Sequence, residues 1–167
     1  MATITFKGNE IHTNGELPAK GDAAPDFKLT NGSLADVSLA SFAGKRKILT
    51  VNPSLDTGVC AATARAFNAK ASSLDDTVVL VVTSDLPFAQ KRFCEAEGLR
   101  NVVPLSLMRD RNFAKAYGLL MTAGPLAGLV ARAVIVLDAE DRVLHAELVP
   151  EVTHEPDYAA ALASLSA

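Results

Sequence analysis

The chain has 167 residues, enough for one domain with a substantial core and too few for two of average size, so we expect a single domain over residues 1–167. Hydrophobic residues make up 49% and charged residues 21%, a composition that excludes fibrous and disordered proteins. The net charge of −3 gives no basis for binding nucleic acid or acidic membranes, which need clustered Lys and Arg. We interpret the longest basic cluster, Lys45-Arg46-Lys47, as a solvated strand edge.

The sequence also shows no signal for export and no membrane-spanning segment. No run of 18 apolar residues could cross a bilayer. The first residues, MATITFKGNEIHTNGEL, carry charges where a secretory signal needs an apolar core. We therefore expect a cytoplasmic protein without a membrane partner.

The first elements in chain order are short extended segments. Residues 3–6 and 10–13 alternate polar with apolar side chains around the sequence KGN, which predicts a β-hairpin within residues 1–15, appended to the rest of the domain. Residues 27–30 and 37–39 flank an Asn-Gly turn and predict a second small sheet element.

Buried strands and helices then alternate along the chain. Apolar, often β-branched runs predict strands over residues 47–51, 77–83, 102–108, 132–137 and 143–149. Apolar residues at helical spacing, with capping residues or glycines at their ends, predict helices over residues 57–71, 88–97, 112–117 and 157–166. This order predicts an α/β fold with a mixed central sheet and helices on both of its faces.

Cys60 ends the sequence PSLDTGVC, which joins a predicted strand to the helix that follows it. In α/β folds, ligands bind at the carboxyl ends of the strands, so this position favours a functional cysteine. The alternative is a small buried core residue, a role in which cysteine is common. Asp56 would oppose ionisation of a nearby thiol, and we interpret it as the helix cap.

A reactive cysteine needs its thiolate form, which makes up only roughly 3% of an unperturbed thiol at pH 7. A helix N-terminus stabilises an anion by at most about 2 kcal/mol, so a nearby cation would still help. Arg132 is our candidate, because it begins an apolar strand where an arginine is costly to bury without an anionic partner.

The second cysteine, Cys94, follows Cys60 by 34 residues (94 − 60), so the chain has no CxxC motif. Two cysteines and three scattered histidines do not make a convincing zinc site. In a reducing compartment, disulfides are mostly transient and catalytic. The pair therefore favours one thiol that oxidises and a second that resolves it.

These residues match a known family. Pro53 to Cys60 fit the Pro-x-x-x-Thr-x-x-Cys motif of the peroxiredoxins, and nearly the whole chain resembles their bacterial thiol peroxidase branch, the atypical two-cysteine type. The other matching stretches are FAGKRKIL at 42–49, DTGVCAATARAFN at 56–68, TVVLVVTSDLPFAQKRFCEAEGL at 77–99, GPLAGLVARAVIVLD at 124–138 and EPDYAAAL at 155–162.

The resemblance implies a thioredoxin-like fold with an N-terminal β-hairpin, and peroxide reduction in antioxidant defence without metal or organic cofactor. It implies that Cys60 is the peroxidatic cysteine and that Cys94 resolves its sulfenic acid as an intramolecular disulfide, which thioredoxin reduces. By the same resemblance, Thr57 and Arg132 orient the peroxide and stabilise developing negative charge, and Pro53 shields the thiolate from water.

The sequence and the resemblance also lead to expectations about the substrate and the oligomeric state. Apolar residues in the 124–130 loop, together with Met121, favour organic hydroperoxides beside hydrogen peroxide. The family implies a homodimer. The sequence departs from the family pattern at Asn52, where related proteins often carry an apolar residue, and this bears on the polarity of the pocket edge rather than on the chemistry.

Three alternatives remain at this point. A general thiol–disulfide oxidoreductase would share the fold, but its CxxC motif is missing. A redox switch or partner-binding domain would use the same two cysteines without sustained turnover. A cysteine hydrolase would pair Cys60 with His145, which lies in a strand pattern without an oxyanion motif, while His12 and His154 lie in turns and need no function.

Overall fold

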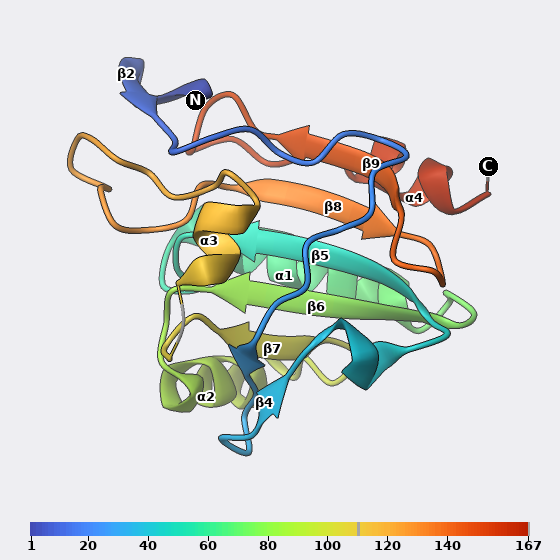
Figure 1. Cartoon of the computed structure of the whole chain (residues 1–167). Coiled ribbons are helices and arrows are strands. Elements are labelled where there is room, and N and C mark those ends of the chain that lie inside the picture. The colour runs from blue at the N-terminus through green and yellow to red at the C-terminus, as the bar shows by residue number, and fades with distance from the viewer. Residues whose placement is uncertain (110, 167) are drawn as a thin grey trace.

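The computed structural model describes residues 1–109 and 111–166. A mixed β-sheet lies at its centre (Figure 1). Its strands run in the order β4-β3-β7-β6-β5-β8-β9. Their bounds are β3 Leu29–Thr30, β4 Asp36–Val37, β5 Arg46–Asn52, β6 Thr77–Thr83, β7 Val103–Ser106, β8 Ala133–Leu137 and β9 Val143–Leu148. β5, β6 and β7 are parallel to one another, whereas β8 is antiparallel to β5 and β9 to β8, so the sheet is mixed as predicted.

The remaining elements are the hairpin and the helices. β1 (Thr3–Phe6) and β2 (Asn9–His12) form a separate antiparallel pair. The helices are α1 Gly58–Ala71, α2 Pro87–Glu97, α3 Asn112–Ala116 and α4 Tyr158–Ala163, with 3-10 turns η1 Leu39–Phe42 and η2 Ser164–Ser166. The last predicted helix therefore ends early, its final residues tightening into η2.

Successive side chains of the central strands point to opposite faces, and both faces are buried, which explains the nearly continuous apolar runs. On one face, Ile48, Val79 and Val134 pack with Phe67 of α1 and Ala161 of α4. On the other, the strands pack against α3 and the segment that follows β2, which Figure 1 shows crossing the near face of the sheet. Helices and extended chain thus enclose the sheet on both sides.

Two predictions about the N-terminal part were wrong. The 27–39 region does not form a second small sheet, because Thr30 of β3 pairs with Ser106 of β7 and extends the main sheet. Nor is the hairpin a mere appendage. The Thr5 N–H donates to Pro150 O at 2.8 Å and the Val152 N–H to Thr5 O at 2.9 Å, so β1 adds to the segment after β9.

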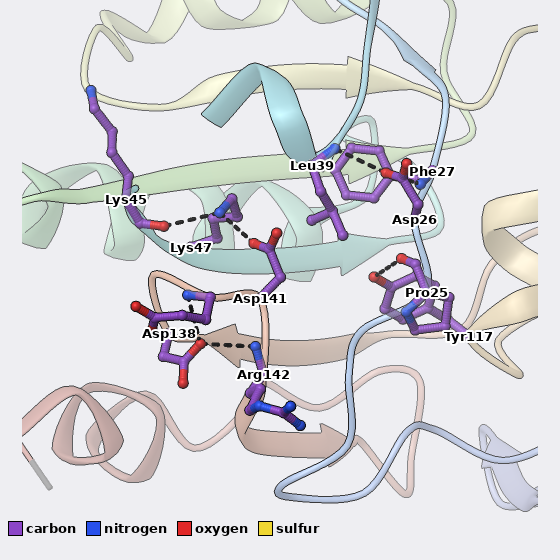
Figure 2. Close-up of polar contacts among 11 residues, drawn as sticks. Pro25, Asp26, Phe27, Leu39, Lys45, Lys47, Tyr117, Asp138, Asp141 and Arg142 are labelled. Atoms are coloured by element: carbon purple, nitrogen blue, oxygen red, sulfur yellow. Dashed lines mark hydrogen bonds and ion pairs between the residues drawn. The ribbon is translucent and has the colours of Figure 1, made fainter. Parts of the chain in front are cut away.

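The basic cluster on β5 also differs from its interpretation as a solvated edge. Lys47 is fully buried. Its ammonium donates to the Asp141 carboxylate at 2.5 Å and to Lys45 O at 3.0 Å, as Figure 2 shows. A buried ammonium needs such partners, because it is very costly to transfer its charge from water to the protein interior without an acceptor or an anion beside it.

Candidate active site

Cys60 lies in the first turn of α1, directly behind the carboxyl end of β5. Pro53 follows the last residue of β5, and Thr57 then adopts an extended conformation with φ −103° and ψ 147° as the N-cap. The Thr57 hydroxyl accepts a hydrogen bond from the Cys60 N–H at 3.4 Å. Cys60 is completely buried, at the helix end that favours an anion.

Arg132 reaches the sulfur from the neighbouring strand. β8 runs antiparallel to β5 with Ala133 opposite Val51, which places Arg132 beside Asn52 and close to the start of α1. The Nη1 of Arg132 lies 3.2 Å from Cys60 Sγ and donates to Asn52 Oδ1 at 2.9 Å. Its Nε donates to Val152 O at 2.9 Å. The guanidinium is thereby held against the thiol.

This contact joins two buried groups. Arg132 is only 2% exposed, and no carboxylate of residues 1–109 and 111–166 forms an ion pair with it. A positive charge in a low-dielectric interior acts strongly on its neighbours. Together with the N-terminus of α1, it surrounds the Cys60 sulfur with positive charge and N–H donors.

A cavity of about 330 Å³ opens beside these groups. Arg132, Thr57 and Pro53 line it, so the cavity reaches the group that contacts the sulfur. Most of its other walls are apolar: Phe6, Val59, Leu126, Leu129 and Val152. The arrangement suits a small molecule with a polar reacting end and an apolar remainder.

Glu151 holds the hairpin against this cavity. Its carboxylate accepts hydrogen bonds from Thr5 Oγ1 at 2.5 Å, from the N–H groups of Lys7 and Gly8 at 2.9 and 3.1 Å, and from Thr153 Oγ1 at 2.8 Å. These donors, the Thr5 hydroxyl first, hold the pKa of Glu151 far below its ordinary value. The same contacts fix Phe6, at the end of β1, as a cavity wall.

Cys94 lies on α2, in a different environment. Both cysteines are free, and Cys94 is half-buried. Burial raises the pKa of its thiol above the ordinary value of 9.0, so Cys94 is protonated near neutral pH. A second hollow of about 430 Å³ adjoins it, lined by Lys91, Glu95 and Arg100 among others.

Comparison with known proteins places this site in a family. The profile of the Redoxin family matches residues 19–162. Thiol peroxidases of Mycobacterium bovis and Mycobacterium tuberculosis are each 52% identical to the chain over 167 residues, which is the full length of this chain and of each relative. The chain belongs to the thiol peroxidase family. It is accordingly a thiol-dependent peroxidase.

Solved structures agree with that assignment. A peroxiredoxin-like protein from Aquifex aeolicus superposes with a TM-score of 0.93 at 36% identity, covering 99% of this chain and 96% of its own. A thiol peroxidase from Chromobacterium violaceum gives 0.91 at 28% identity, with 98% and 95% covered. The predicted thioredoxin-like fold with an N-terminal hairpin is confirmed.

Four of the five residues that the resemblance to the peroxiredoxins singled out lie together. Cys60 contacts Arg132, while Pro53, Thr57 and Arg132 line one cavity. Cys94 lies on the separate helix α2. The interpretation of Asp56 as the helix cap was wrong: Thr57 is the N-cap, because only its side chain lies within reach of the Cys60 N–H, and Asp56 is exposed one residue too early.

Several parts of this candidate site were not predicted from the sequence. Phe6 and Val152 reach the cavity from segments far apart in the sequence, and no local pattern marks them. Met121, expected near the substrate, is 1% exposed and packs in the core instead. Asn52 stood out as a polar residue after an apolar strand, but its contact with Arg132 depends on the strand register.

Two further observations concern other kinds of function. Among residues 1–109 and 111–166, no three His, Cys, Asp or Glu side chains gather as metal ligands would. Within the same described part of the chain, no helix is both long and apolar enough to span a bilayer.

Proposed function

We propose that residues 1–167 act as one peroxiredoxin domain that reduces hydrogen peroxide and organic hydroperoxides, with Cys60 as the peroxidatic cysteine. The observation that carries this assignment is the 3.2 Å contact between Arg132 Nη1 and Cys60 Sγ at the N-terminus of α1. At Cys94, by contrast, burial raises the pKa of the thiol. The two thiols therefore suit different roles.

In the first step, the Cys60 thiolate attacks the terminal oxygen of the peroxide. A sulfur–oxygen bond forms, the oxygen–oxygen bond breaks, and the departing oxygen leaves as alkoxide or hydroxide and takes up a proton. Arg132, through its guanidinium, and Thr57, through its hydroxyl, orient the peroxide and stabilise the negative charge on the leaving oxygen. Pro53 shields the thiolate from water.

In the second step, the thiol of Cys94 condenses with the sulfenic acid of Cys60. A disulfide forms and water leaves. Thioredoxin then reduces the disulfide by thiol–disulfide exchange, as is typical of the family. Because the two cysteines lie on different helices, their regions must rearrange before the Cα atoms come within the roughly 7 Å that a disulfide requires.

The apolar walls of the cavity support organic hydroperoxides as substrates, because Phe6, Leu126 and Leu129 can cover an alkyl or aryl group. A homodimer in the cytoplasm is the family expectation. Leu86 and Phe88, 53% and 65% exposed at the start of α2, support an apolar interface between two copies.

The test is steady-state consumption of cumene hydroperoxide and hydrogen peroxide, coupled to thioredoxin, thioredoxin reductase and NADPH. Turnover should vanish in Cys60→Ser, whereas Cys94→Ser should react once and stall. A redox switch gives the opposite outcome: the unmutated protein oxidises once and shows no sustained NADPH consumption. Full turnover in Cys60→Ser would assign the chemistry to another residue.

A further inference from the structure

Asn52, the last residue of β5, is a fully buried amide whose two ends have different partners. Its Nδ2 donates to Thr50 O at 3.2 Å and to Thr50 Oγ1 at 3.3 Å, both two residues earlier on the strand. Its Oδ1 accepts from Arg132 Nη1 at 2.9 Å. Since Thr50 offers acceptors, it fixes the amide so that the oxygen faces the guanidinium.

The partners of Arg132 have an unusual chemistry for a buried arginine. Its acceptors are the amide oxygen of Asn52, the carbonyl of Val152 and the sulfur of Cys60. A buried guanidinium usually has a carboxylate partner, which holds it in place and also cancels its charge. Here, the first two acceptors hold the group and leave the charge uncancelled.

We propose that Asn52 is a positioning residue: it holds Arg132 Nη1 against the Cys60 sulfur through a neutral acceptor and so reserves the positive charge of the guanidinium for the thiolate. The same nitrogen makes both contacts, so a displacement of Asn52 moves the donor that touches the sulfur. This inference rests on the proposed role of Cys60. It assigns to the amide a function that a carboxylate of the same shape could not perform.

Tyr158 is a titratable group close enough to Arg132 for the charge of the guanidinium to act on it. Tyr158 of α4 donates to Glu155 at 2.8 Å and to Thr63 of α1 at 3.3 Å. Burial, first among the causes, raises the pKa of Tyr158 to about 12, so it is neutral at physiological pH. Asp56, on the loop before α1, is exposed to solvent. Glu155 and Asp56 are present unchanged in each variant below, so they do not affect the comparison.

The experiment compares Asn52→Asp with Asn52→Leu in the Cys94→Ser background, where Cys60 is the only thiol. Asn101→Asp is the matched control, because it adds the same charge at an exposed amide that bonds to Asn68. For each protein, the pH dependence of iodoacetamide alkylation gives the midpoint of Cys60 ionisation. Stopped-flow oxidation by hydrogen peroxide gives the single-turnover rate from pH 5 to 10.

Asn52→Asp should move the ionisation midpoint up by about one pH unit, because the new carboxylate pairs with the guanidinium and weakens its effect on the thiolate. Below that midpoint the peroxide rate should fall about tenfold, and it should recover at alkaline pH. Asn52→Leu should lower the rate at every pH, since the guanidinium loses an acceptor and its fixed position. Asn101→Asp should match the Cys94→Ser parent.

An Asn52→Asp profile that superimposes on the Asn101→Asp profile would overturn the inference. So would an Asn52→Leu variant that is folded and as reactive as the parent. If Asn52→Leu fails to fold, the nearly isosteric Asn52→Asp still decides. A parent that does not react with peroxide would defeat the proposed function, whereas the alkylation midpoints would still test how Asn52 acts on Arg132.

Discussion

Asp85 binds the loop that carries the peroxiredoxin motif: its carboxylate accepts a hydrogen bond from Ser54 Oγ at 2.6 Å, 31 residues earlier in the chain. The Leu55 N–H donates to the same carboxylate at 2.7 Å and the Thr83 hydroxyl at 2.8 Å. Asp85 lies between β6 and α2, the helix of Cys94. It therefore links the segment before Cys60 to the segment before Cys94.

Replacing Asp85 by Asn should loosen that loop. An asparagine at this position has one oxygen and one NH₂ group, and the NH₂ group would face a donor that the carboxylate now accepts from. At least one charge-assisted hydrogen bond is therefore lost, which should lower the free energy of unfolding by about 2 kcal/mol. Urea unfolding measures this loss, and hydrogen exchange should quicken at Leu55. Asp56→Asn, an exposed carboxylate on the same loop, is the control. Equal stability of the two variants would contradict the prediction.

The strands of the core were predictable because their apolar runs reflect burial on both faces. The 77–83 prediction matches β6 residue for residue, and α1 begins within one residue of its predicted start. The contact between Cys60 and Arg132 was predictable as well, since the motif marked the cysteine and the apolar strand marked the arginine as its nearby cation. Both signals are local in the sequence.

Contacts set by tertiary structure were not predictable. Lys47 looked like a solvated cation, but its buried ammonium has its anionic partner in Asp141, 94 residues later. The hairpin looked independent, because no residue near it in the sequence indicates that Glu151 binds its turn. Asn52 was visible as an anomaly, but its effect on Arg132 follows from the pairing of β5 with β8. In each case the missing information was the identity of a distant partner.

Oxidation should unwind the helix turns that carry the two cysteines. Cys60 is completely buried in α1 and Cys94 lies inside α2, so we expect both segments to leave their present positions when a bond forms between them. Hydrogen exchange should be faster at residues 57–62 and 90–96 in the disulfide form than in the reduced form. Exchange that is no faster there in the oxidised protein would count against this rearrangement.

Cys94 should react slowly with alkylating agents in the folded protein. Burial raises the pKa of its thiol above 9.0, so in Cys60→Ser its labelling by iodoacetamide should rise with a midpoint above pH 9. The raised pKa also means that the unfolded chain loses this proton first as pH increases. The contribution of the Cys94 thiol to the free energy of unfolding is therefore fully present below about pH 9, and it is lost as the pH rises toward the pKa of the folded state.

The same Cys60→Ser protein in denaturant is the control, since unfolding should return the labelling midpoint to the value of an exposed thiol. The alkaline loss of stability should be smaller in Cys94→Ser, which lacks the titrating group. An unchanged midpoint on unfolding would show that burial does not govern this thiol.

The ion pair between buried Lys47 and partly exposed Asp141 should respond asymmetrically to mutation (Figure 2). Asp141→Asn leaves a buried ammonium without its anion and should cost about 3 kcal/mol of unfolding free energy. Asparagine tolerates the left-handed backbone at this position, where φ is 64°, so backbone strain does not confuse the result. Lys47→Met removes the charge that needs compensation and should cost about 1 kcal/mol or less.

The double variant completes this cycle. Lys47→Met with Asp141→Asn should be about as stable as Lys47→Met alone, because Asp141 is 30% exposed and can be solvated without its partner. Urea unfolding of all four proteins measures the coupling. Equal losses in the two single variants would mean that desolvation of the ammonium is not the dominant cost.

Phe6 should determine how well the enzyme accepts bulky peroxides. It ends β1 and lines the cavity beside Arg132, where an aryl group of cumene hydroperoxide would rest against it. Phe6→Ala removes apolar contact worth about 1–2 kcal/mol, so kcat/KM for cumene hydroperoxide should fall about tenfold. Hydrogen peroxide has no apolar part to lose that contact, and its kcat/KM should change less than twofold.

Phe88→Ala is the matched control, because this aromatic side chain is 65% exposed on α2 and does not line the cavity. It should leave the ratio of the two kcat/KM values as it is in the unmutated protein. A parallel fall for both peroxides in Phe6→Ala would instead mean that the hairpin supports Arg132 through Val152, whose N–H binds Thr5 and whose carbonyl holds the guanidinium. The ratio therefore separates a substrate contact from a structural support.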